Sequence, residues 1–218
     1  MAKYRLEFSK EGDAKFVSHL DLVRLFTRVF KRAGLPLAYS EGFNPHPKMS
    51  IGIPLSVGVT SEAELLDAEF YEEVPALEIK ARMNETMPIG IAITKVQKLE
   101  QGMPKLSSVS RASYRISLSG DGVAKEALSE FLQRETIEIE KKTKRSEKLV
   151  DIKPDIFGID WEDETTLVMT LATGSAANLK PEVVLSAMKL YIPGCSGEAE
   201  TVHRLAMTDD NGCALIAG

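Results

Sequence analysis

Two short segments near the N-terminus carry the residue types that bind anions and transfer protons. One segment is residues 16–21, and the other is residues 38–48, a run rich in Gly and Pro. Histidine exchanges protons near neutral pH, while lysine and the free N–H groups at a helix start attract phosphate or carboxylate. We therefore predict one ligand-binding pocket formed by both segments. Its polar members are Ser18, His19, Asp21, Tyr39, Ser40, Glu41, Asn44, His46 and Lys48.

The two histidines of this cluster leave two further interpretations open. In the first, His19 and His46 act as the acid and the base of a metal-independent ribonuclease or other hydrolase, and Lys48 stabilises the charge on phosphate. In the second, the residues are structural, because a histidine at a helix start often bonds locally and Pro-His-Pro makes a rigid turn. We assign no catalytic residue. We also expect no metal, since no His-Glu-x-x-His run places two ligands on one helical face.

A second candidate site is the basic segment of residues 141–153. Its cationic members are Lys141, Lys142, Lys144, Arg145, Lys148 and Lys153. A basic extension that runs off a strand suits contacts with the phosphates of RNA or DNA. Since no aromatic residue is interleaved for base stacking, we expect binding by phosphate contacts or shape rather than by sequence readout. Solvated surface charge is the alternative interpretation.

Composition limits the classes of protein to which the chain can belong. It has 218 residues and a net charge of −5, so basic residues do not cover its whole surface. It has no run of about 18 uncharged apolar residues, which a membrane-spanning helix needs, and no apolar signal-peptide core. Its two cysteines are too few for a disulfide framework, and glycine loops of the nucleotide-binding types are missing. We expect a cytoplasmic protein with no membrane contact and no cofactor.

The elements that must position the first cluster follow from hydrophobic periodicity. Residues 4–8 alternate like a strand. Ser18 starts a helix that Gly34 and Pro36 end, with apolar residues at helical spacing on one side and a basic stripe on the other. The basic stripe consists of Arg24, Arg28, Lys31 and Arg32. Further elements are expected at residues 51–59, 65–70, 77–87 and 91–96. The resulting order is β-α-β-β-α-β.

The second half of the chain repeats this order after a linker at residues 101–113, which is rich in Ser, Gly and Pro. Its elements are expected at residues 114–118, 123–134, 136–142, 166–171, 181–191 and 202–207. The order suits two helices packed on one face of an antiparallel sheet. The sequence thus predicts an α+β protein of two tandem ferredoxin-like domains, residues 1–103 and residues 104–218, each with an antiparallel sheet.

Parts of both halves resemble a known family. Residues 16–22 and 32–48 are similar to the signature of the radical-SAM-linked family of uncharacterised bacterial proteins, and residues 150–154 and 174–181 also look like family features. Members are fused to, or encoded beside, a radical S-adenosylmethionine (SAM) protein. The resemblance implies a radical SAM protein as partner. The chain lacks the Cys-x-x-x-Cys-x-x-Cys run that holds the iron–sulfur cluster of such enzymes, so it is not itself the radical enzyme.

Three hypotheses for the function remain open. The leading one is a radical-SAM-associated accessory protein that binds RNA, or presents substrate to its partner, in RNA or ribosome-related modification. The second is a metal-independent ribonuclease or hydrolase, for which the predicted architecture resembles the tandem ferredoxin-like endoribonucleases that process CRISPR repeats. The third is a protein-interaction module without a ligand, which docks through the Gly/Pro-rich loop. We favour a non-catalytic accessory over a stand-alone enzyme.

Overall fold

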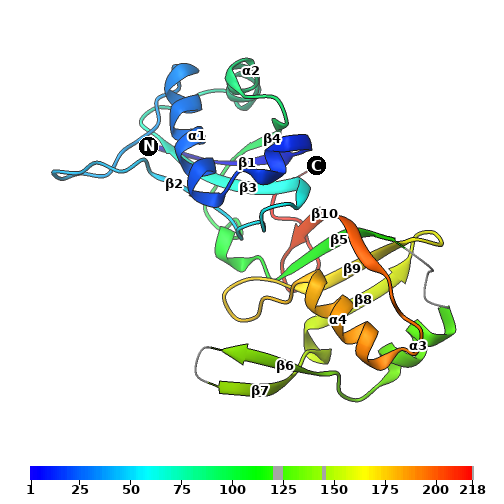
Figure 1. Cartoon of the computed structure of the whole chain (residues 1–218). Coiled ribbons are helices and arrows are strands. Elements are labelled where there is room, and N and C mark those ends of the chain that lie inside the picture. The colour runs from blue at the N-terminus through cyan, green and yellow to red at the C-terminus, as the bar shows by residue number, and fades with distance from the viewer. Residues whose placement is uncertain (120–124, 144–145, 218) are drawn as a thin grey trace. The chain divides into compact units, whose positions relative to one another are not determined.

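The computed structural model describes residues 1–119, 125–143 and 146–217. The chain divides into two compact units, which we call unit 1 and unit 2 (Figure 1). Unit 1 consists of Met1–Val109 and Ala206–Gly218, and unit 2 consists of Ser110–Leu205. Both combine helices with antiparallel strands, which confirms the expected α+β class. The C-terminal residues cluster with unit 1, whereas the expected division placed residues 104–218 together.

Unit 1 has the chain order β-α-β-β-α-β. Its strands are β1 (Ala2–Lys10), β2 (Met49–Ile51), β3 (Thr60–Phe70) and β4 (Ile91–Lys98). Its helices are α1 (His19–Arg32), α2 (Ala76–Thr86) and two short 3-10 helices, η1 (Gly12–Phe16) and η2 (Leu106–Ser108). Strand β1 lies between β3 and β4 and pairs antiparallel with both, while the short β2 pairs with the edge of β3 that faces away from β1.

The core of unit 1 lies between the sheet and its two helices, which cover the same face of the sheet (Figure 1). Tyr4, Leu6 and Phe8 alternate along β1 and are almost fully buried, as a strand with one covered face requires. The rings of Phe8 and Phe26, which lies on α1, have centroids 4.8 Å apart. Because apolar residues recur three or four positions apart along α1, they form one buried face and leave the other to solvent.

Unit 2 contains a sheet and a separate hairpin. Its strands are β5 (Arg111–Ser119), β6 (Glu138–Thr143), β7 (Ser146–Asp151), β8 (Ile156–Trp161), β9 (Thr166–Ala172) and β10 (Glu198–Thr208), whose last residues belong to unit 1. Its helices are α3 (Lys125–Gln133), α4 (Pro181–Tyr191) and the short η3 (Lys153–Asp155). The strand order is β10-β5-β9-β8, and β6 pairs with β7 outside this sheet. None of the helices in the described ranges has the length and apolar composition that crossing a bilayer requires.

Two predicted strands differ from the structure. The strand expected at residues 136–142 corresponds to β6, which pairs with β7 outside the main sheet, and β8 takes the place beside β9. Strand β6 is mostly charged, so it has no apolar face to pack against the helices. In unit 1, the apolar run at residues 51–59 is a strand only as far as Ile51. The strand ends there because Pro54 has no N–H to donate and Gly58 adopts a φ of 91°.

Candidate functional site

The residues at the start of α1 form a local cap. Ser18 precedes the helix, and its Oγ accepts a hydrogen bond from the Asp21 N–H at 3.3 Å and donates one to Asp21 Oδ2 at 2.7 Å. Arg24 Nη1 donates to Asp21 Oδ1 at 3.1 Å. The hydrogen bond from Ser18 and the Arg24 guanidinium lower the pKa of Asp21. Ser18 and Asp21 are therefore engaged in holding the helix end, and His19 is the half-buried first residue of the helix.

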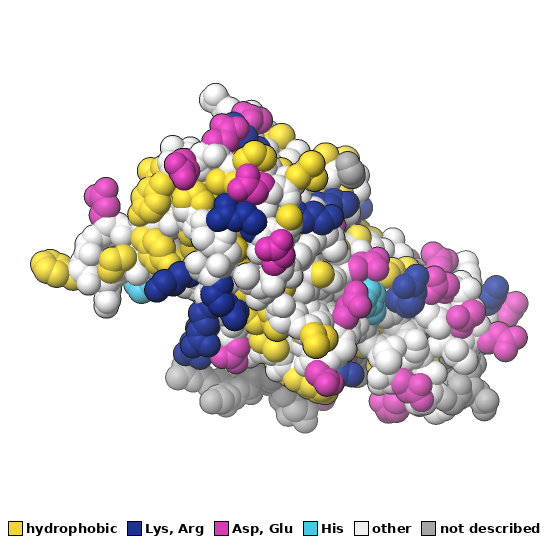
Figure 2. Space-filling model, turned by 90° about the horizontal axis from the view of Figure 1, so that it is seen from above, with side chains coloured by type: hydrophobic (Ala, Val, Ile, Leu, Met, Phe, Trp, Pro, Cys, Tyr) yellow, Lys and Arg dark blue, Asp and Glu magenta, His cyan; other side chains and the backbone are white. Residues whose placement is uncertain are grey.

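The second predicted segment forms a narrow loop that is closed at its base. The Ser40 N–H donates to the His46 carbonyl at 2.9 Å, and the His46 N–H donates to Ser40 Oγ at 2.9 Å. Next to this pair, the Lys48 N–H donates to the Ala38 carbonyl at 2.8 Å. Residues 41–45 are exposed, and Phe43 is fully exposed at their centre. Figure 1 shows the loop projecting from unit 1, and Figure 2 shows hydrophobic side chains in yellow on this protrusion.

The other residues of this loop differ in their surroundings. Glu41 and Asn44 belong to the projecting part and are exposed. Tyr39 lies at the base, where its half-buried ring packs against the core and its N–H donates to Tyr71 Oη at 3.1 Å. The loop therefore has an anchored base and a solvated end.

Lys48 borders an open pocket of about 410 Å³ on unit 1. Its Nζ lies 3.8 Å from Glu69 Oε2, while Lys3 Nζ lies 2.8 Å from Glu69 Oε1. The hydrogen bond from Lys3 and the charge of Lys48 lower the pKa of Glu69. Asp67 also lines the pocket. Because a carboxylate already lies between the two ammonium groups, this pocket offers little attraction for a further anion.

The structure does not bring His19 and His46 together. His19 lies just beyond the end of β1, where Lys10 Nζ donates to the backbone that leads into the helix. His46 lies near Lys48, whose carboxylate partner also binds Lys3 at the start of β1. The nine residues of β1 separate these ends by roughly 25 Å. The two histidines therefore do not form the acid–base pair of the ribonuclease hypothesis. The described residues also contain no group of three or more His, Cys, Asp or Glu placed to hold a metal ion.

The basic segment forms the β6–β7 hairpin of unit 2. Lys141 and Lys148 lie directly opposite each other in the strand pairing, and both are exposed. Because side chains alternate along a strand, these lysines share one face with Ile139 and Val150. The acidic residues assigned to the other face are Glu138, Glu140 and Asp151. Lys142 lies in β6, but its side chain is not described, and Lys144 and Arg145 lie outside the described residues.

Lys153, the last cation of the basic segment, has a structural contact. It is half-buried, and its Nζ donates to the Leu132 carbonyl in α3. Asp151 Oδ1 accepts hydrogen bonds from the Ile137 N–H at 2.8 Å and the Lys153 N–H at 3.0 Å. The bond to Leu132 engages the Lys153 ammonium group and ties the base of the hairpin to α3, while the bonds to Asp151 hold the backbone at that base.

Helix α1 presents a further basic surface. The sequence predicted it as a basic stripe, but its residues were not among the predicted site residues. Its cations Arg24, Arg28, Lys31 and Arg32 are all exposed. Arg24 pairs with Asp21, whereas the other three have no carboxylate partner among the residues that the structure describes. Figure 2 shows Lys and Arg side chains in dark blue beside the base of the protruding loop.

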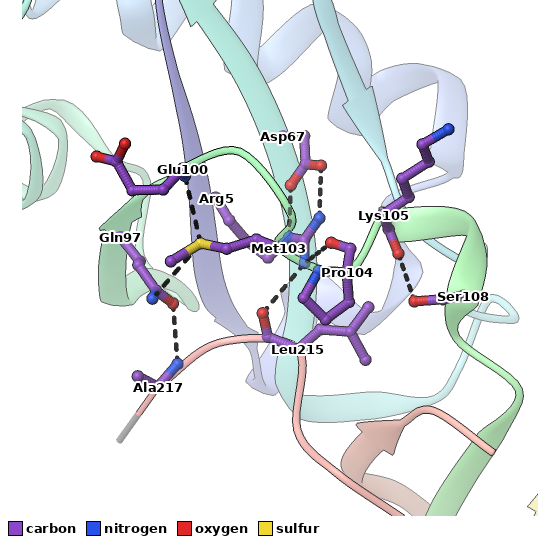
Figure 3. A network of polar contacts seen from close by, with 10 residues as sticks. All are labelled: Arg5, Asp67, Gln97, Glu100, Met103, Pro104, Lys105, Ser108, Leu215 and Ala217. Atoms are coloured by element: carbon purple, nitrogen blue, oxygen red, sulfur yellow. Dashed lines mark hydrogen bonds and ion pairs between the residues drawn. The ribbon is translucent and has the colours of Figure 1, made fainter. Parts of the chain in front are cut away.

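Sequence reasoning missed a buried polar network in unit 1 (Figure 3). Arg5 is fully buried, and its Nε and Nη2 donate to the two carboxylate oxygens of Asp67 at 2.7 and 2.8 Å. Its Nη1 donates to the carbonyls of Pro104 at 2.9 Å and Leu215 at 3.1 Å. The network thereby ties the segment after β4 and the C-terminal segment to the sheet. The alternation of side chains along β1 predicts that Arg5 is exposed, so the sequence pattern gave no sign that it is buried.

A family model described as "Uncharacterized protein conserved in bacteria (DUF2344)" matches residues 3–181. The chain belongs to this family. The matched region includes both N-terminal site segments and the β6–β7 hairpin. No curated protein matches the chain.

The solved structures that match the chain each contain a chain about twice as long. One is the crystal structure of a Cbf5-Nop10-Gar1 complex, with a TM-score of 0.50 and 12% identity over 94% of this chain and 48% of that chain. Another is the archaeal box H/ACA sRNP Nop10-Cbf5 complex, with a TM-score of 0.45 and 11% identity over 92% and 46%. A third is an H/ACA RNP bound to a substrate RNA containing 2′-deoxyuridine, with a TM-score of 0.44 and 12% identity over 93% and 46%. The first of these matches shows a likeness of fold alone.

Proposed function

We propose that this protein binds RNA and acts as a non-catalytic accessory of a radical SAM protein. The observation that carries the proposal is the exposed cross-strand pair of Lys141 and Lys148. Like charges on directly opposite residues, with Cβ atoms about 5 Å apart, destabilise a strand pair. An anion bound beside the two ammonium groups removes that repulsion. The regularly spaced phosphates of a nucleic acid supply such anions.

The distribution of charge on the hairpin supports the same proposal. The face that carries Lys141 and Lys148 has Ile139 and Val150 as its other described members, and the carboxylates are assigned to the opposite face. The whole protein carries a net charge of −5. A basic face on an acidic protein attracts a polyanion locally, while the rest of the surface does not bind nucleic acid non-specifically.

The choice of RNA as ligand and of a radical SAM partner rests on the resemblance of residues 16–22 and 32–48 to the radical-SAM-linked family. The two cysteines, Cys195 and Cys213, cannot replace the three cysteine ligands of the cluster in such enzymes. The initiating chemistry therefore belongs to the partner, and this protein contributes recognition.

A patch of exposed apolar side chains supports the existence of a protein partner. The patch surrounds η1 in unit 1, where the Gly58 N–H donates to the Lys15 carbonyl at 2.9 Å and the Glu11 N–H donates to the Gly90 carbonyl at 2.7 Å. Its members are Phe16, Leu20, Val57 and Ile89, each more than half exposed. Grouped apolar side chains in water favour association with another protein. We propose the patch around η1 as the docking surface for the radical SAM protein.

The finer description of the fold is part of the proposal. We infer that both units are ferredoxin-like, because unit 1 has the strand order β4-β1-β3-β2 and unit 2 has the corresponding order β10-β5-β9-β8. In unit 2 the β6–β7 hairpin is then an insertion between the first helix and the second strand of the repeat.

Among the residues predicted to bind a ligand, Ser18 and Asp21 cap α1, and His19 is the first residue of that helix. We therefore propose the ligand-binding role for the loop residues alone, which are Tyr39, Ser40, Glu41, Asn44, His46 and Lys48.

Charge removal on the hairpin tests RNA binding. We expect the double variant Lys141→Ala/Lys148→Ala to bind single-stranded RNA more weakly and with a flatter salt dependence. Each bound phosphate contributes about 0.7 to the log–log slope of affinity against salt, so removing both ammonium groups lowers its magnitude by about 1.4. Titrations of RNA at several salt concentrations measure the slope.

The matched control is Lys105→Ala/Lys180→Ala, which removes two exposed lysines elsewhere and leaves the hairpin intact. No RNA binding by the wild type at low salt, or an unchanged slope in the hairpin variant, contradicts the proposed interface. A companion radical SAM protein that modifies its substrate with the same rate and selectivity in the absence of this chain contradicts the accessory role.

A further inference from the structure

We infer that unit 1 carries a second site, specific for single-stranded RNA, in which Phe43 stacks on an unpaired base and the basic face of α1 holds the phosphates. The inference rests on the proposed RNA-binding function and adds a surface distinct from the β6–β7 hairpin. Two observations carry it: a closed loop that exposes an aromatic ring, and unpaired cations on the helix that precedes the loop.

The loop presents Phe43 in a fixed place. Its base is closed by the two hydrogen bonds between Ser40 and His46. Pro45 and Pro47 restrict the backbone on the returning branch. Phe43 itself is fully exposed, so the rest of the described structure leaves its ring uncovered. A ring held on a restrained backbone loses little conformational freedom when a flat partner packs against it.

The outer face of α1 supplies positive charge. Arg24, Arg28 and Lys31 lie within about 60° of one another around the helix axis, opposite the buried Phe26. Arg28, Lys31 and the neighbouring Arg32 have no carboxylate partner in the described part of the chain. Lys31 and Arg32 lie in the last turn, where they also complement the helix dipole, but Arg28 lies outside that turn. The dipole therefore does not account for the whole basic face.

The aromatic ring and the cations belong to neighbouring parts of unit 1. Gly34, with a φ of 62°, ends α1, and the chain then joins the edge of β3 through the bond from the Ala38 N–H to the Glu69 carbonyl at 2.8 Å. The projecting loop begins two residues later. Arg32 at the end of α1 and Ser40 at the start of the loop are eight residues apart, a stretch of chain that spans at most about 28 Å. One extended strand of nucleic acid can therefore reach both features.

Single-stranded RNA fits this combination better than the other classes of partner. An unpaired base offers a flat π face to Phe43, and the phosphates that flank it meet Arg28, Lys31 and Arg32. In a duplex the bases are already stacked on each other, so the ring has no face to cover. A purely apolar protein surface leaves the three cations without counter-charges.

The inference is tested with the purified full chain and an oligouridine of about 12 nucleotides. We expect Phe43→Ala to weaken binding about tenfold or more without changing the salt slope, because stacking is not ionic. Phe43→Trp restores the affinity, since it keeps a stacking ring. For the triple variant Arg28→Ala/Lys31→Ala/Arg32→Ala, we expect a flatter log–log dependence of affinity on salt concentration. The magnitude of this slope falls by about 0.7 for each phosphate that the helix no longer binds. Duplex RNA shows no loss of affinity with Phe43→Ala.

Leu77→Ala and Lys105→Ala are the controls, because both side chains are exposed on unit 1 and belong neither to the loop nor to α1. If the loop and α1 variants bind the oligouridine like the wild type while the Lys141/Lys148 variant loses affinity, the inference is overturned and the proposed function stands. If the wild type binds no RNA at low salt, both fail. If Phe43→Ala weakens a complex with a protein partner and leaves RNA affinity unchanged, the loop is a protein-docking element and the inference is wrong.

Discussion

Arg5 lies at a position of β1 where strand alternation predicts a solvent-exposed side chain. It is instead fully buried, and its three guanidinium nitrogens all donate hydrogen bonds. A buried guanidinium is tolerated because each nitrogen that leaves water gains an oxygen, and Asp67 supplies the compensating charge. Two of the acceptors are carbonyls of Pro104 and Leu215, far away in the sequence.

Replacing Arg5 by lysine tests the importance of this geometry. We expect the free energy of unfolding to fall by about 3 kcal/mol, because one ammonium group cannot reach both Asp67 oxygens and both carbonyls. Urea denaturation measures the loss. Arg115→Lys is the matched control, since Arg115 also bonds both oxygens of a carboxylate, Glu162, but the two side chains are 43% and 41% exposed. We expect the control to change stability by less than about 1 kcal/mol, and equal losses would show that burial is not the cause.

At the scale of the element, α1 combines signals that are all local in sequence. Ser18 caps its first turn, apolar residues form one face, basic residues form the other, and Gly34 ends it. The cap orients the first turn of the helix. After Gly34 the chain changes direction and runs toward the edge of β3. The helix thus separates the two N-terminal segments by its own length, roughly 20 Å for 14 residues.

The cap of α1 predicts a pH-dependent contribution to stability. Ser18→Ala is expected to cost about 1 kcal/mol, because the Asp21 N–H loses its acceptor. Asp21→Asn also destabilises the protein at neutral pH. The folded-state pKa of Asp21 is lowered, so its carboxylate stabilises the fold above the unfolded-state value of about 3.9, and this contribution disappears as pH falls through the folded-state pKa.

Unfolding titrations between about pH 7 and pH 3 test this dependence. The difference in stability between the wild type and Asp21→Asn should become smaller toward the acid end of the range. Asp210→Asn, at an exposed position in a turn, is the control and is expected to behave like the wild type throughout. A difference between the wild type and Asp21→Asn that stays constant down to the lowest pH means that the charge of Asp21 is not what stabilises the helix.

At the scale of the whole molecule, unit 1 is completed by both ends of the described chain. Leu215 and Ile216 are buried, and the Ala217 N–H donates to Gln97 Oε1 at 2.9 Å (Figure 3). The segment after β4 joins the same network, where the Met103 sulfur accepts a hydrogen bond from the Glu100 N–H at 3.4 Å. The last segment of the described chain therefore belongs to unit 1, although all of unit 2 separates it in sequence from residues 1–109.

The accessory role predicts a complex through the patch around η1. We expect Leu20→Ser/Ile89→Ser to weaken binding to the radical SAM protein of the same organism at least tenfold, because each buried apolar side chain contributes about 1.5–3 kcal/mol. Titration calorimetry at micromolar or higher concentration measures the affinity. Leu77→Ser is the control, since Leu77 is also exposed but lies at the start of α2, away from the patch. An unchanged affinity of the double variant excludes the patch as the docking surface.

The sequence by itself determined the features that depend on near neighbours in the chain. The helix over residues 181–191 and the start and end of α1 follow from periodicity, Pro181, Ser18 and Gly34. The Gly/Pro-rich run was also recognisable as a loop. These predictions hold because capping, backbone preference and amphipathic spacing act over a few residues.

The tertiary structure alone decided which of these features meet. It separates His19 from His46, engages Lys153 within unit 2, buries Arg5 and sets β6 apart from the main sheet. Each outcome depends on contacts between segments that lie far apart in the sequence. A periodic pattern states which side of an element is apolar, but the partner that covers that side is chosen by the packing of the whole unit.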